Sequence, residues 1–426
     1  MSIAQIAKKA KSASILLSAV KTDVKNTALA KIAEALKSRS AEIIAANQKD
    51  LRLAEKNKLA GPLLKRLKFD EGKIADTIAG IESLIKLADP VGQTLTATQL
   101  DEGLNLYKVS CPIGVIGVVF ESRPDALVQI STLCLKSGNA VLLKGGSEAA
   151  NTNKILTKVI ADASVKANIP DGWIQLLETR QDVAEMLKMD EDIDLVIPRG
   201  SNEFVRYIMN HTNIPVLGHA DGICHVYVDA GADIDMAVKI SVDSKCQYVA
   251  VCNATETLLV DSKIAKEFLP KVKAAFDAKN VELRGDKNTR AFIKAKPATE
   301  KDWSTEYLDY ILSIKVVDGV DEAIEHINHY GSHHTDAIVT RDKATAERFM
   351  DLVDSAGVFW NCSTRFADGY RYGLGAEVGI STTKIHARGP VGLEGLRIYK
   401  WKLLGSGQIV ADYADGRKKF THKKLV

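Results

Sequence analysis

Apolar residues in the first part of the chain recur at the spacing of an amphipathic helix. The residues that share one face of the predicted helices are Leu29, Ile32, Leu36, Ile43, Ile44 and Leu51. Side chains three and four positions apart lie on the same side of a helix, so each helix can bury one stripe and expose the other. We therefore predict that residues 1–90 form helices that pack on a core.

From residue 111 the pattern changes to short apolar runs that alternate with helical stretches. The runs predicted as strands are 115–120, 140–144, 173–178, 194–198 and 215–219. Pro124 stands near the start of the first intervening helix and Gly138 follows its end, as is typical of helix boundaries. Ser147 can cap the next helix, which runs toward Pro170. This alternation predicts a parallel sheet with helices on both faces.

A second region of the same kind follows. Its predicted strands are 225–229, 310–317, 336–340 and 357–361, and its predicted helices include 234–244 and 321–330. The segment 244–260 is apolar and strand-like. The alternating run 396–404 could add a strand to an open sheet edge or to a partner subunit. The whole pattern predicts an α/β protein.

Composition and charge exclude several classes of protein. The 426 residues exceed one ordinary domain, so we expect two or three. With 46% apolar and 26% charged residues, the composition is that of a soluble globular protein. A net charge of +3 offers no footprint for nucleic acid. The basic tail 416–426 is interpreted as a solvated terminus rather than a membrane or phosphate patch.

No segment predicts export or membrane insertion. The run 13–20 follows lysines but continues into a polar helix without a small-residue cleavage site. No apolar run reaches the length of a membrane span. The six cysteines are too sparse for a disulfide scaffold and show no close ligand spacing. We therefore expect a reducing, cytoplasmic location, no membrane partner and no metal site.

Several basic residues stand where parallel strands end, which is where open α/β sheets bind ligands. Lys144 ends a predicted strand and is followed by two glycines and a helix start, an arrangement that suits an anion but is also common in ordinary turns. Arg123, Arg199 and Arg365 lie in loops after strands, and Arg123 could equally form a surface salt bridge. Together they suggest a substrate richer in negative charge than a simple aldehyde.

The roles of cysteine and histidine stay open at this level. Cys246 and Cys252 could include a nucleophile, could be half of a metal site, or could be small core residues. The histidines at 329, 333 and 334 predict a polar loop more than a metal site. The glycines of segment 373–379 have the wrong spacing for a dinucleotide fingerprint and follow no strand.

Seven longer motifs bring these features together in one order along the chain. They are "PIGVIGVVFESRPDA", "GNAVLLKGGSEA", "IPRGSNEF", "HADGICHVYVD", "CQYVAVCNATETLLV", "GSHHTDAIVT" and "STRFADGYRYGLGAEVGISTTKIHARGP". They resemble the aldehyde dehydrogenase superfamily and, within it, the γ-glutamyl phosphate reductases, across nearly the whole chain. The resemblance implies an aldehyde dehydrogenase-like α/β fold, with two Rossmann-like domains built on parallel sheets and a small β oligomerisation element.

The same resemblance implies a division into domains. The cofactor-binding domain would comprise residues 1–98 and 112–223, and the catalytic domain residues 224–392. Residues 99–111 and 393–426 would form an oligomerisation hairpin and a C-terminal segment, so a homo-oligomer is expected.

The resemblance also nominates site residues. Cys252 corresponds to the catalytic thiol of the family and Asn253 follows it as in the motif, whereas Cys246 has no role there. The residues that would bind the cofactor are Lys144, Gly146, Ser147, Arg199, Gly200 and Glu306. The residues that would bind substrate are Arg123, Ser122, Arg365, Ser363 and His219. Relatives that prefer NAD often carry a glutamate where this chain has Ser147, so NADPH/NADP is the expected cofactor.

The implied reaction is the NADPH-dependent reduction of γ-glutamyl 5-phosphate to glutamate 5-semialdehyde and phosphate through a cysteine thioester, in proline synthesis. A glutamate 5-kinase could hand over the labile acyl phosphate. Oxidising relatives carry a glutamate base upstream of the thiol, and this chain has His219, Ala220 and Asp221 around that place. An oxidising semialdehyde dehydrogenase of the same fold is the alternative, and a binding protein that has lost catalysis is a more distant one.

Overall fold

The computed structural model describes residues 1–59, 61–121 and 123–425. The chain opens with a helical layer, as the apolar spacing predicted. Its helices are α1 (Ile3–Leu17), α2 (Thr22–Ser38), α3 (Ser40–Lys56), α4 (Gly61–Leu67) and α5 (Glu71–Lys86). Leu29, Ile32 and Leu36 of α2 are all buried, which confirms the predicted apolar face.

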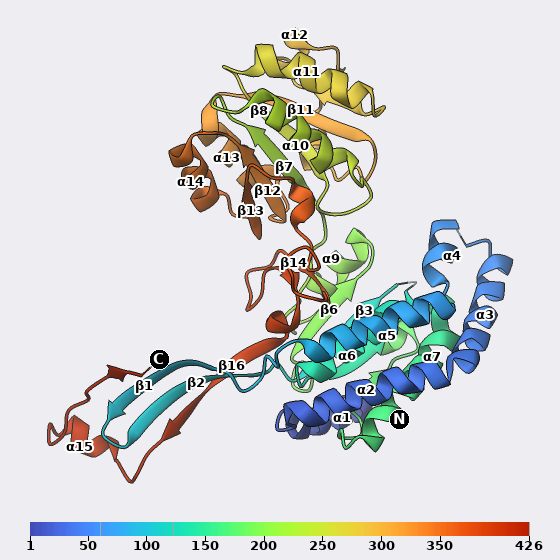
Figure 1. Ribbon diagram of the computed structural model, residues 1–426, viewed down its shortest axis with the longest axis vertical. Helices are drawn as coiled ribbons and strands as arrows, with labels where there is room; N and C mark the ends of the chain where they lie inside the picture. Colours follow the sequence, from blue (N-terminus) through green and yellow to red (C-terminus); the bar gives the residue numbers. More distant parts are fainter. Residues whose placement is uncertain (60, 122, 426) are drawn as a thin grey trace.

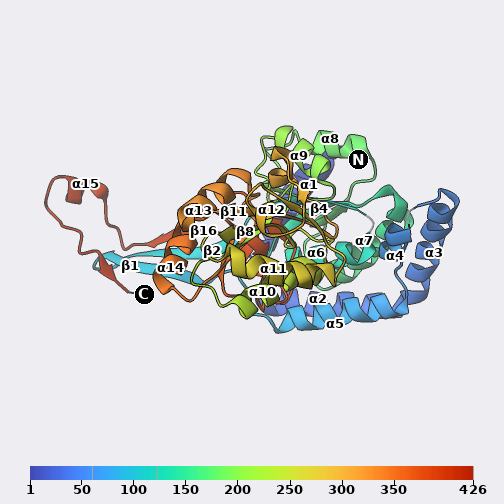
Figure 2. The ribbon, with the colours of Figure 1, turned by 90° about the horizontal axis from the view of Figure 1, so that it is seen from above.

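The first sheet contains four parallel strands in the order β5-β4-β3-β6. The strands are β3 (Val115–Phe120), β4 (Ala140–Lys144), β5 (Ile174–Leu176) and β6 (Leu195–Arg199). Their connecting helices are α6 (Pro124–Lys136), α7 (Ala150–Lys166), α8 (Arg180–Met186) and α9 (Asn202–Asn210). Figure 2 shows α1 and α8 on the opposite side of the sheet from α2 and α5, so both faces are covered.

Two local predictions in this region are wrong. Residues 215–219 do not form a fifth strand but a single bridge from Val216 to Val196, because Pro215 lacks an N–H and the chain soon turns away. Ser147 does not cap α7, since it begins a short 3₁₀ turn (η1, Ser147–Ala149). The carboxylate of Asp50 in α3 instead accepts the N–H groups of Asn151 and Thr152 at 3.2 and 2.8 Å. A distant helix therefore supplies this cap.

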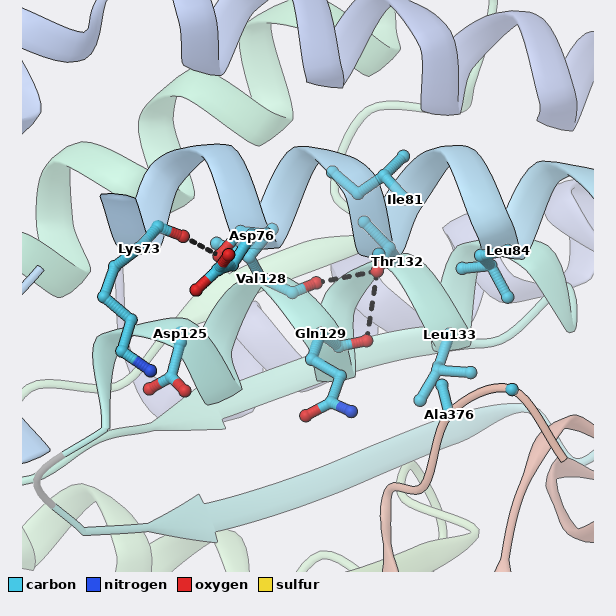
Figure 3. A pocket seen from close by; sticks show the side chains of 13 residues that line it. Lys73, Asp76, Ile81, Leu84, Asp125, Val128, Gln129, Thr132, Leu133 and Ala376 are labelled. Atoms are coloured by element: carbon cyan, nitrogen blue, oxygen red, sulfur yellow. Dashed lines mark hydrogen bonds between the residues drawn. The ribbon is translucent and has the colours of Figure 1, made fainter. Parts of the chain in front are cut away.

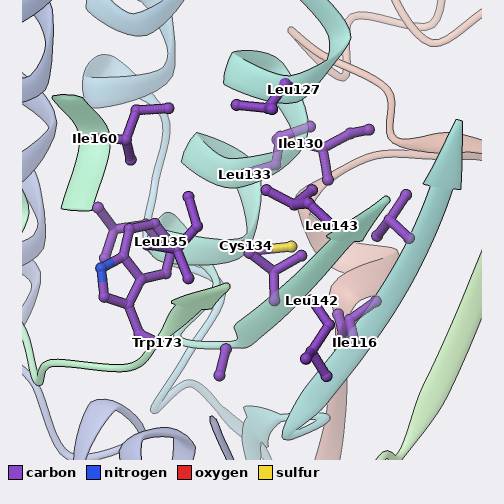
Figure 4. Close-up of a cluster of buried hydrophobic side chains, with 14 of the residues drawn as sticks. Ile116, Leu127, Ile130, Leu133, Cys134, Leu135, Leu142, Leu143, Ile160 and Trp173 are labelled. Atoms are coloured by element: carbon purple, nitrogen blue, oxygen red, sulfur yellow. The ribbon is translucent and has the colours of Figure 1, made fainter. Parts of the chain in front are cut away.

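The core between the sheet and its helices is closely packed (Figure 4). Cys134 and Trp173 are both fully buried within it, and the Trp173 indole N–H donates to Ser164 Oγ at 2.9 Å. Burial raises the pKa of Cys134 to about 12, so this sulfur acts as a small apolar side chain.

The second sheet contains seven parallel strands in the order β10-β9-β11-β8-β7-β12-β13. They are β7 (Cys224–Val228), β8 (Thr255–Asp261), β9 (Glu282–Gly285), β10 (Lys296–Pro297), β11 (Ile311–Val317), β12 (Thr335–Val339) and β13 (Gly357–Trp360). The helices around it are α10 (Ile234–Cys246), α11 (Ala265–Asp277), α12 (Thr289–Phe292), α13 (Gly319–Tyr330) and α14 (Lys343–Leu352), with 3₁₀ turns η2 (Glu300–Ser304) and η3 (Thr364–Phe366).

The segment 244–260 is not one strand, contrary to the sequence-based expectation. Cys246 is the last residue of α10, residues 247–254 form a turn, and only β8 is extended. The apolar run therefore joins the end of a helix to the start of a buried strand, and Cys252 lies in the loop between them.

A four-stranded antiparallel sheet forms an arm that projects from the rest of the molecule in Figure 1. Its strands are β1 (Thr94–Asp101), β2 (Leu104–Pro112), β16 (Arg397–Leu404) and β17 (Lys423–Lys424), in the order β16-β2-β1-β17. β16 confirms the strand expected at 396–404 and pairs with β2 of its own chain. The hairpin starts at Thr94 rather than at residue 99, and β17 shows that the basic tail returns to β1.

Three short elements lie between the second sheet and the arm, namely β14 (Gly379–Ser381), β15 (Gly389–Val391) and the 3₁₀ turn η4 (Leu393–Leu396). The helix α15 (Val410–Ala414) lies between β16 and β17 at the far end of the arm (Figure 1). Among the helices of the described residues, none is long and apolar enough to cross a bilayer. The fold brings the carboxyl ends of the first sheet and the amino ends of the second toward the same loops, and these loops carry the candidate site residues.

Candidate active site

Cys252 lies in the loop that enters β8, and its side chain is partly exposed. Gly222 approaches this loop so closely that a Cβ there would lie 2.2 Å from the Cys252 carbonyl oxygen. Only glycine fits such an approach. The thiol of Cys224, at the start of β7, donates to the same carbonyl at 3.2 Å. The backbone that carries Cys252 is therefore held from two sides.

His334 faces the Cys252 sulfur. Its Nε2 lies 3.2 Å from Sγ, and its Nδ1 lies 2.9 Å from Thr335 Oγ1. The side chain is buried, with 1% exposed, because it directly precedes the buried strand β12. His334 lies in the loop before β12, as predicted, but its burial was not expected. The neighbouring His333 does fit that prediction, since it is only partly buried and contacts the Asp354 carbonyl.

Burial decides the charge state of this pair. Burial first, and then the carboxylates of Glu306 and Glu377, raise the pKa of the Cys252 thiol to about 12, while Arg365 opposes them. Burial likewise lowers the pKa of His334 to about 3. At neutral pH the resting pair is thus a thiol beside a neutral imidazole, and the S–H group can donate to Nε2.

Two carboxylates stand near the thiol. Glu306, in the stretch before β11, accepts the Gly222 N–H at 3.0 Å and the Asn202 side-chain N–H at 2.7 Å. Glu377 accepts the Gly369 N–H at 2.9 Å. Burial raises the pKa of both groups. Glu306 was predicted, whereas Glu377 was missed because its segment matches no nucleotide fingerprint and gives no other sequence signal.

Arg365 lies in the η3 turn, and Ser363 directly precedes it. Both lie beside residues 247–254, the loop that carries Cys252, which we call the thiol loop. Arg365 is buried and donates from Nε to Gln247 Oε1 at 2.9 Å. Ser363 Oγ accepts the Arg365 N–H at 3.2 Å and a bond from the Ser244 hydroxyl, so this hydroxyl shapes the turn that carries Arg365. The guanidinium lies close enough to Cys252 for the two charges to interact.

Asn253 joins the thiol loop to the same turn. Its side-chain amide donates to the Ala367 carbonyl at 2.8 Å, and its own carbonyl accepts the Thr364 hydroxyl at 2.8 Å. Its Oδ1 is buried without a hydrogen-bond partner among the described residues. In this structure Asn253 holds the η3 turn against the thiol loop.

The remaining predicted substrate residues divide into two groups. His219 lies near Cys252 and His334, because the centroid of its ring is 5.3 Å from that of His334. Its Nδ1 lies 3.3 Å from the Ile380 carbonyl oxygen. Arg123 is exposed at the start of α6. Ser122 lies outside the described residues.

Arg199 lies at the end of β6 and faces inward. Its Nη1 is buried without a hydrogen-bond partner in the described part of the chain. Burial lowers its pKa, and the neighbouring Arg123 lowers it further. A partly buried guanidinium with one buried, unpaired donor, beside a second cation, is suited to binding an anion.

A cavity of about 920 Å³ opens at the carboxyl ends of β3 and β4. Of the predicted cofactor residues, Lys144, Gly146 and Ser147 line it. Lys144 donates to the Gly145 carbonyl. A Cβ on Gly146 would meet the Glu148 carboxylate, so a larger residue there would require that side chain to move. Arg199, Gly200 and Glu306 are not among its lining residues.

A second cavity, of about 200 Å³, lies between α5 and α6 (Figure 3). Its lining includes Lys73, Asp125, Gln129 and Thr132, and the Thr132 hydroxyl donates back to the Val128 carbonyl of its own helix. None of the predicted catalytic, cofactor or substrate residues that the structure describes lines this cavity.

The fold is that of a known class of enzymes. The aldehyde dehydrogenase family model matches residues 1–296. The chain therefore belongs to the aldehyde dehydrogenase family, whose members are oxidoreductases that use a nicotinamide cofactor.

Within that family the chain is one of the γ-glutamyl phosphate reductases. It is 67% identical over 425 residues to the γ-glutamyl phosphate reductase of Pelotomaculum thermopropionicum, with 100% of this chain and 98% of that one covered. It is also 67% identical to the protein of that name from Acetivibrio thermocellus, with 100% and 99% covered.

A solved structure supports the same placement. The crystal structure of γ-glutamyl phosphate reductase from Thermotoga maritima is 42% identical and superposes with a TM-score of 0.93, covering 96% of this chain and 100% of that one. An acetylating aldehyde dehydrogenase from Geobacillus thermoglucosidasius, 17% identical with a TM-score of 0.62 over 96% of this chain and 97% of that one, shares the fold.

Proposed function

We propose that this protein reduces γ-glutamyl 5-phosphate to glutamate 5-semialdehyde and phosphate, with NADPH, in proline biosynthesis. The observation that carries the proposal is the partly exposed Cys252 thiol, 3.2 Å from an imidazole and close to a buried arginine. A thiol so placed suits acyl transfer from an activated carboxyl group.

The first step is attack of the Cys252 sulfur on the acyl carbon. A new S–C bond forms, the C–O bond to phosphate breaks, and phosphate leaves with the electron pair, which gives a thioester. His334 Nε2 is the group placed to accept the thiol proton as the S–C bond forms. Its Nδ1 contact with Thr335 Oγ1 orients the ring for this role.

Three arginines supply cations for a substrate with two anionic ends. Arg365 lies in the η3 turn, which contacts the thiol loop, and it interacts electrostatically with Cys252. Arg199 interacts with both Cys252 and Arg123. We assign the carboxylate and phosphate of the substrate to this group of side chains, because guanidinium forms paired hydrogen bonds with either anion.

The large cavity at the carboxyl ends of β3 and β4 fits a dinucleotide. Lys144, Gly146 and Ser147 would hold its adenosine end, and Glu306 its nicotinamide ribose, beside the thiol loop. When bound, the reduced nicotinamide would supply the hydride that converts the thioester to the aldehyde. The exposed Ser147 leaves room for a 2′-phosphate, which favours NADPH over NADH.

The units of the fold would divide the work. We assign cofactor binding to the first sheet with its helices and catalysis to the second sheet. The projecting arm exposes large apolar side chains on β16, namely Ile398, Tyr399, Trp401, Leu403 and Leu404. Such a surface is suited to contact with another copy of the chain.

Phosphate dependence tests this function. Run in reverse, the purified protein should reduce NADP⁺ with glutamate 5-semialdehyde only when inorganic phosphate is present, because phosphate is needed to release the acyl group from Cys252. An oxidising semialdehyde dehydrogenase would instead reduce NADP⁺ equally well without phosphate, since water would cleave its thioester. That result would overturn the proposal.

A further inference from the structure

Three potential metal ligands converge around the thiol. One ligand atom each from His219, Cys252 and His334 lies within 4.8 Å of the others. The three residues come from the loops before β7, β8 and β12, so only the folded chain assembles them. The ligands of one tetrahedral zinc ion stand about 3.3–3.6 Å apart. Side-chain movements that bring the three ligand atoms about 1 Å closer together would therefore be enough to coordinate one ion.

Both imidazoles are oriented as metal ligands usually are. His219 Nδ1 lies 3.3 Å from the Ile380 carbonyl oxygen, which can only accept, so this nitrogen carries the hydrogen and Nε2 keeps a free lone pair. His334 Nδ1 is engaged by Thr335 Oγ1, and its Nε2 points at the sulfur. The carbonyl partner fixes the tautomer of His219, and the Thr335 hydroxyl, which can accept from Nδ1–H, orients the ring of His334 with Nε2 toward the sulfur.

The donor set selects the kind of ion. Two imidazole nitrogens and one thiolate suit zinc, whereas magnesium and calcium require oxygen ligands. Three protein ligands leave a fourth position for water, as in open zinc sites. Cys252 is partly exposed, which gives an ion a route to the sulfur. The nearby carboxylates of Glu306 and Glu377 favour a cation, while Arg199 and Arg365 oppose it.

We propose that His219, Cys252 and His334 form a Zn²⁺ site that, when occupied, blocks the thiol and stops turnover. Binding replaces the thiol proton, which passes to solvent, with a Zn–S bond, so the sulfur becomes a weaker nucleophile and the ion occupies the space beside it that an acyl group needs. Removing the ion restores the thiol without any redox change. The inhibition rests on the function proposed above, whereas the binding of zinc does not.

Metal binding to the reduced, chelator-stripped full-length protein tests the site without substrate. One equivalent of ZnCl₂ should bind in competition with a chromophoric chelator. Cys252→Ser, His219→Gln and His334→Gln should each weaken this binding at least about tenfold, and the matched control Cys246→Ala should leave it unchanged. Co²⁺ should give a thiolate charge-transfer band that is absent in Cys252→Ser. Equal zinc affinity in Cys252→Ser, or no stoichiometric binding, would overturn the site.

Activity then tests the inhibition separately. In the wild type and in Cys246→Ala, activity should fall in proportion to the zinc bound and return completely with EDTA. Full turnover at one bound zinc per chain would overturn the inhibitory role. The proposed function would fail in a different way, through phosphate-independent reduction of NADP⁺ by the zinc-free protein, and that result would leave the metal titration untouched.

Discussion

The Nε2 atom of His334 lies 3.2 Å from the Sγ atom of Cys252, although 82 residues separate them in the chain. Cys252 precedes β8 and His334 precedes β12, and β7 lies between these two strands in the sheet. The amino ends of parallel strands meet at one edge of a sheet, so the two loops face each other there. This contact gives the thiol a hydrogen-bond acceptor that the local sequence does not supply.

Replacing Cys252 with alanine should abolish phosphate-dependent reduction of NADP⁺, because no other group on the thiol loop can form the acyl intermediate. Circular dichroism should show an unchanged fold, since the partly exposed side chain adds little to the core. Cys246→Ala is the matched control and should keep nearly full activity, as Cys246 ends a helix away from His334. Residual activity of Cys252→Ala above background would refute the role of the sulfur.

Replacing His334 with asparagine should lower kcat by about 10²- to 10⁴-fold, the usual contribution of a positioned base, with little change in KM. The rate of Cys252 alkylation by iodoacetamide should fall in the same variant, because the sulfur loses its acceptor. His333→Asn is the control, since His333 has φ of 60°, a conformation that asparagine tolerates. A proportional rise in KM with unchanged kcat would instead assign His334 to substrate binding.

Replacing Ser147 with glutamate should shift cofactor preference toward NAD⁺ by about ten- to a hundredfold. The added carboxylate would face a 2′-phosphate, and two like charges about 4 Å apart repel by about 1–4 kcal/mol near a protein surface. The measurement is the ratio of kcat/KM for NADP⁺ and NAD⁺. Ser147→Ala serves as the control and should keep the original preference. An unchanged ratio in the glutamate variant would show that the 2′-phosphate binds elsewhere.

The buried ion pair of Lys245 and Glu256, 2.5 Å apart, should make stability depend on pH. Burial raises the pKa of Glu256 from its ordinary 4.5 to about 7, against the pull of Lys245. The folded state therefore binds more protons than the unfolded state, and this group's contribution to stability is lost as pH rises from about 4.5 to about 7.

Single and double variants of this pair should show strong coupling. At pH 8, where Glu256 is ionised, Glu256→Gln leaves the Lys245 ammonium buried without its partner and should destabilise the fold by about 3–5 kcal/mol, whereas at pH 5 the cost should be smaller because the glutamate is already protonated. Lys245→Met should make the loss of stability with rising pH steeper. The double variant Lys245→Met with Glu256→Gln should recover most of the lost stability. Melting temperatures measured by calorimetry between pH 5 and pH 8 would contradict this account if the two single effects simply added.

Much of the fold follows from local patterns. The helix face of Leu29, Ile32 and Leu36 and the strands β3, β4 and β11 were all predicted from apolar spacing. The errors arose where one pattern covered two elements or where a cap came from afar. The apolar run 244–260 joined the end of α10 to β8, and Asp50 rather than Ser147 satisfies the start of α7.

Some residues of the candidate site could be nominated from the sequence, and others could not. The family resemblance nominated Cys252, Lys144 and Glu306, because it is carried by contiguous segments around each of them. His334 was assigned to a polar loop, and Glu377 was not recognised at all, because the sequence around each shows nothing of what it faces. The same holds for the cluster of His219, Cys252 and His334, whose wide spacing predicted no metal site.

The sequence by itself determined most of the helices and strands, and it nominated the thiol, because hydrophobic periodicity and contiguous motifs are properties of neighbouring residues. The tertiary structure decided what the thiol meets. Parallel strands bring together loops that are distant in the chain, and burial in those loops sets the protonation of Cys252 and His334. Neither the contact nor the low local polarity is encoded within any single segment.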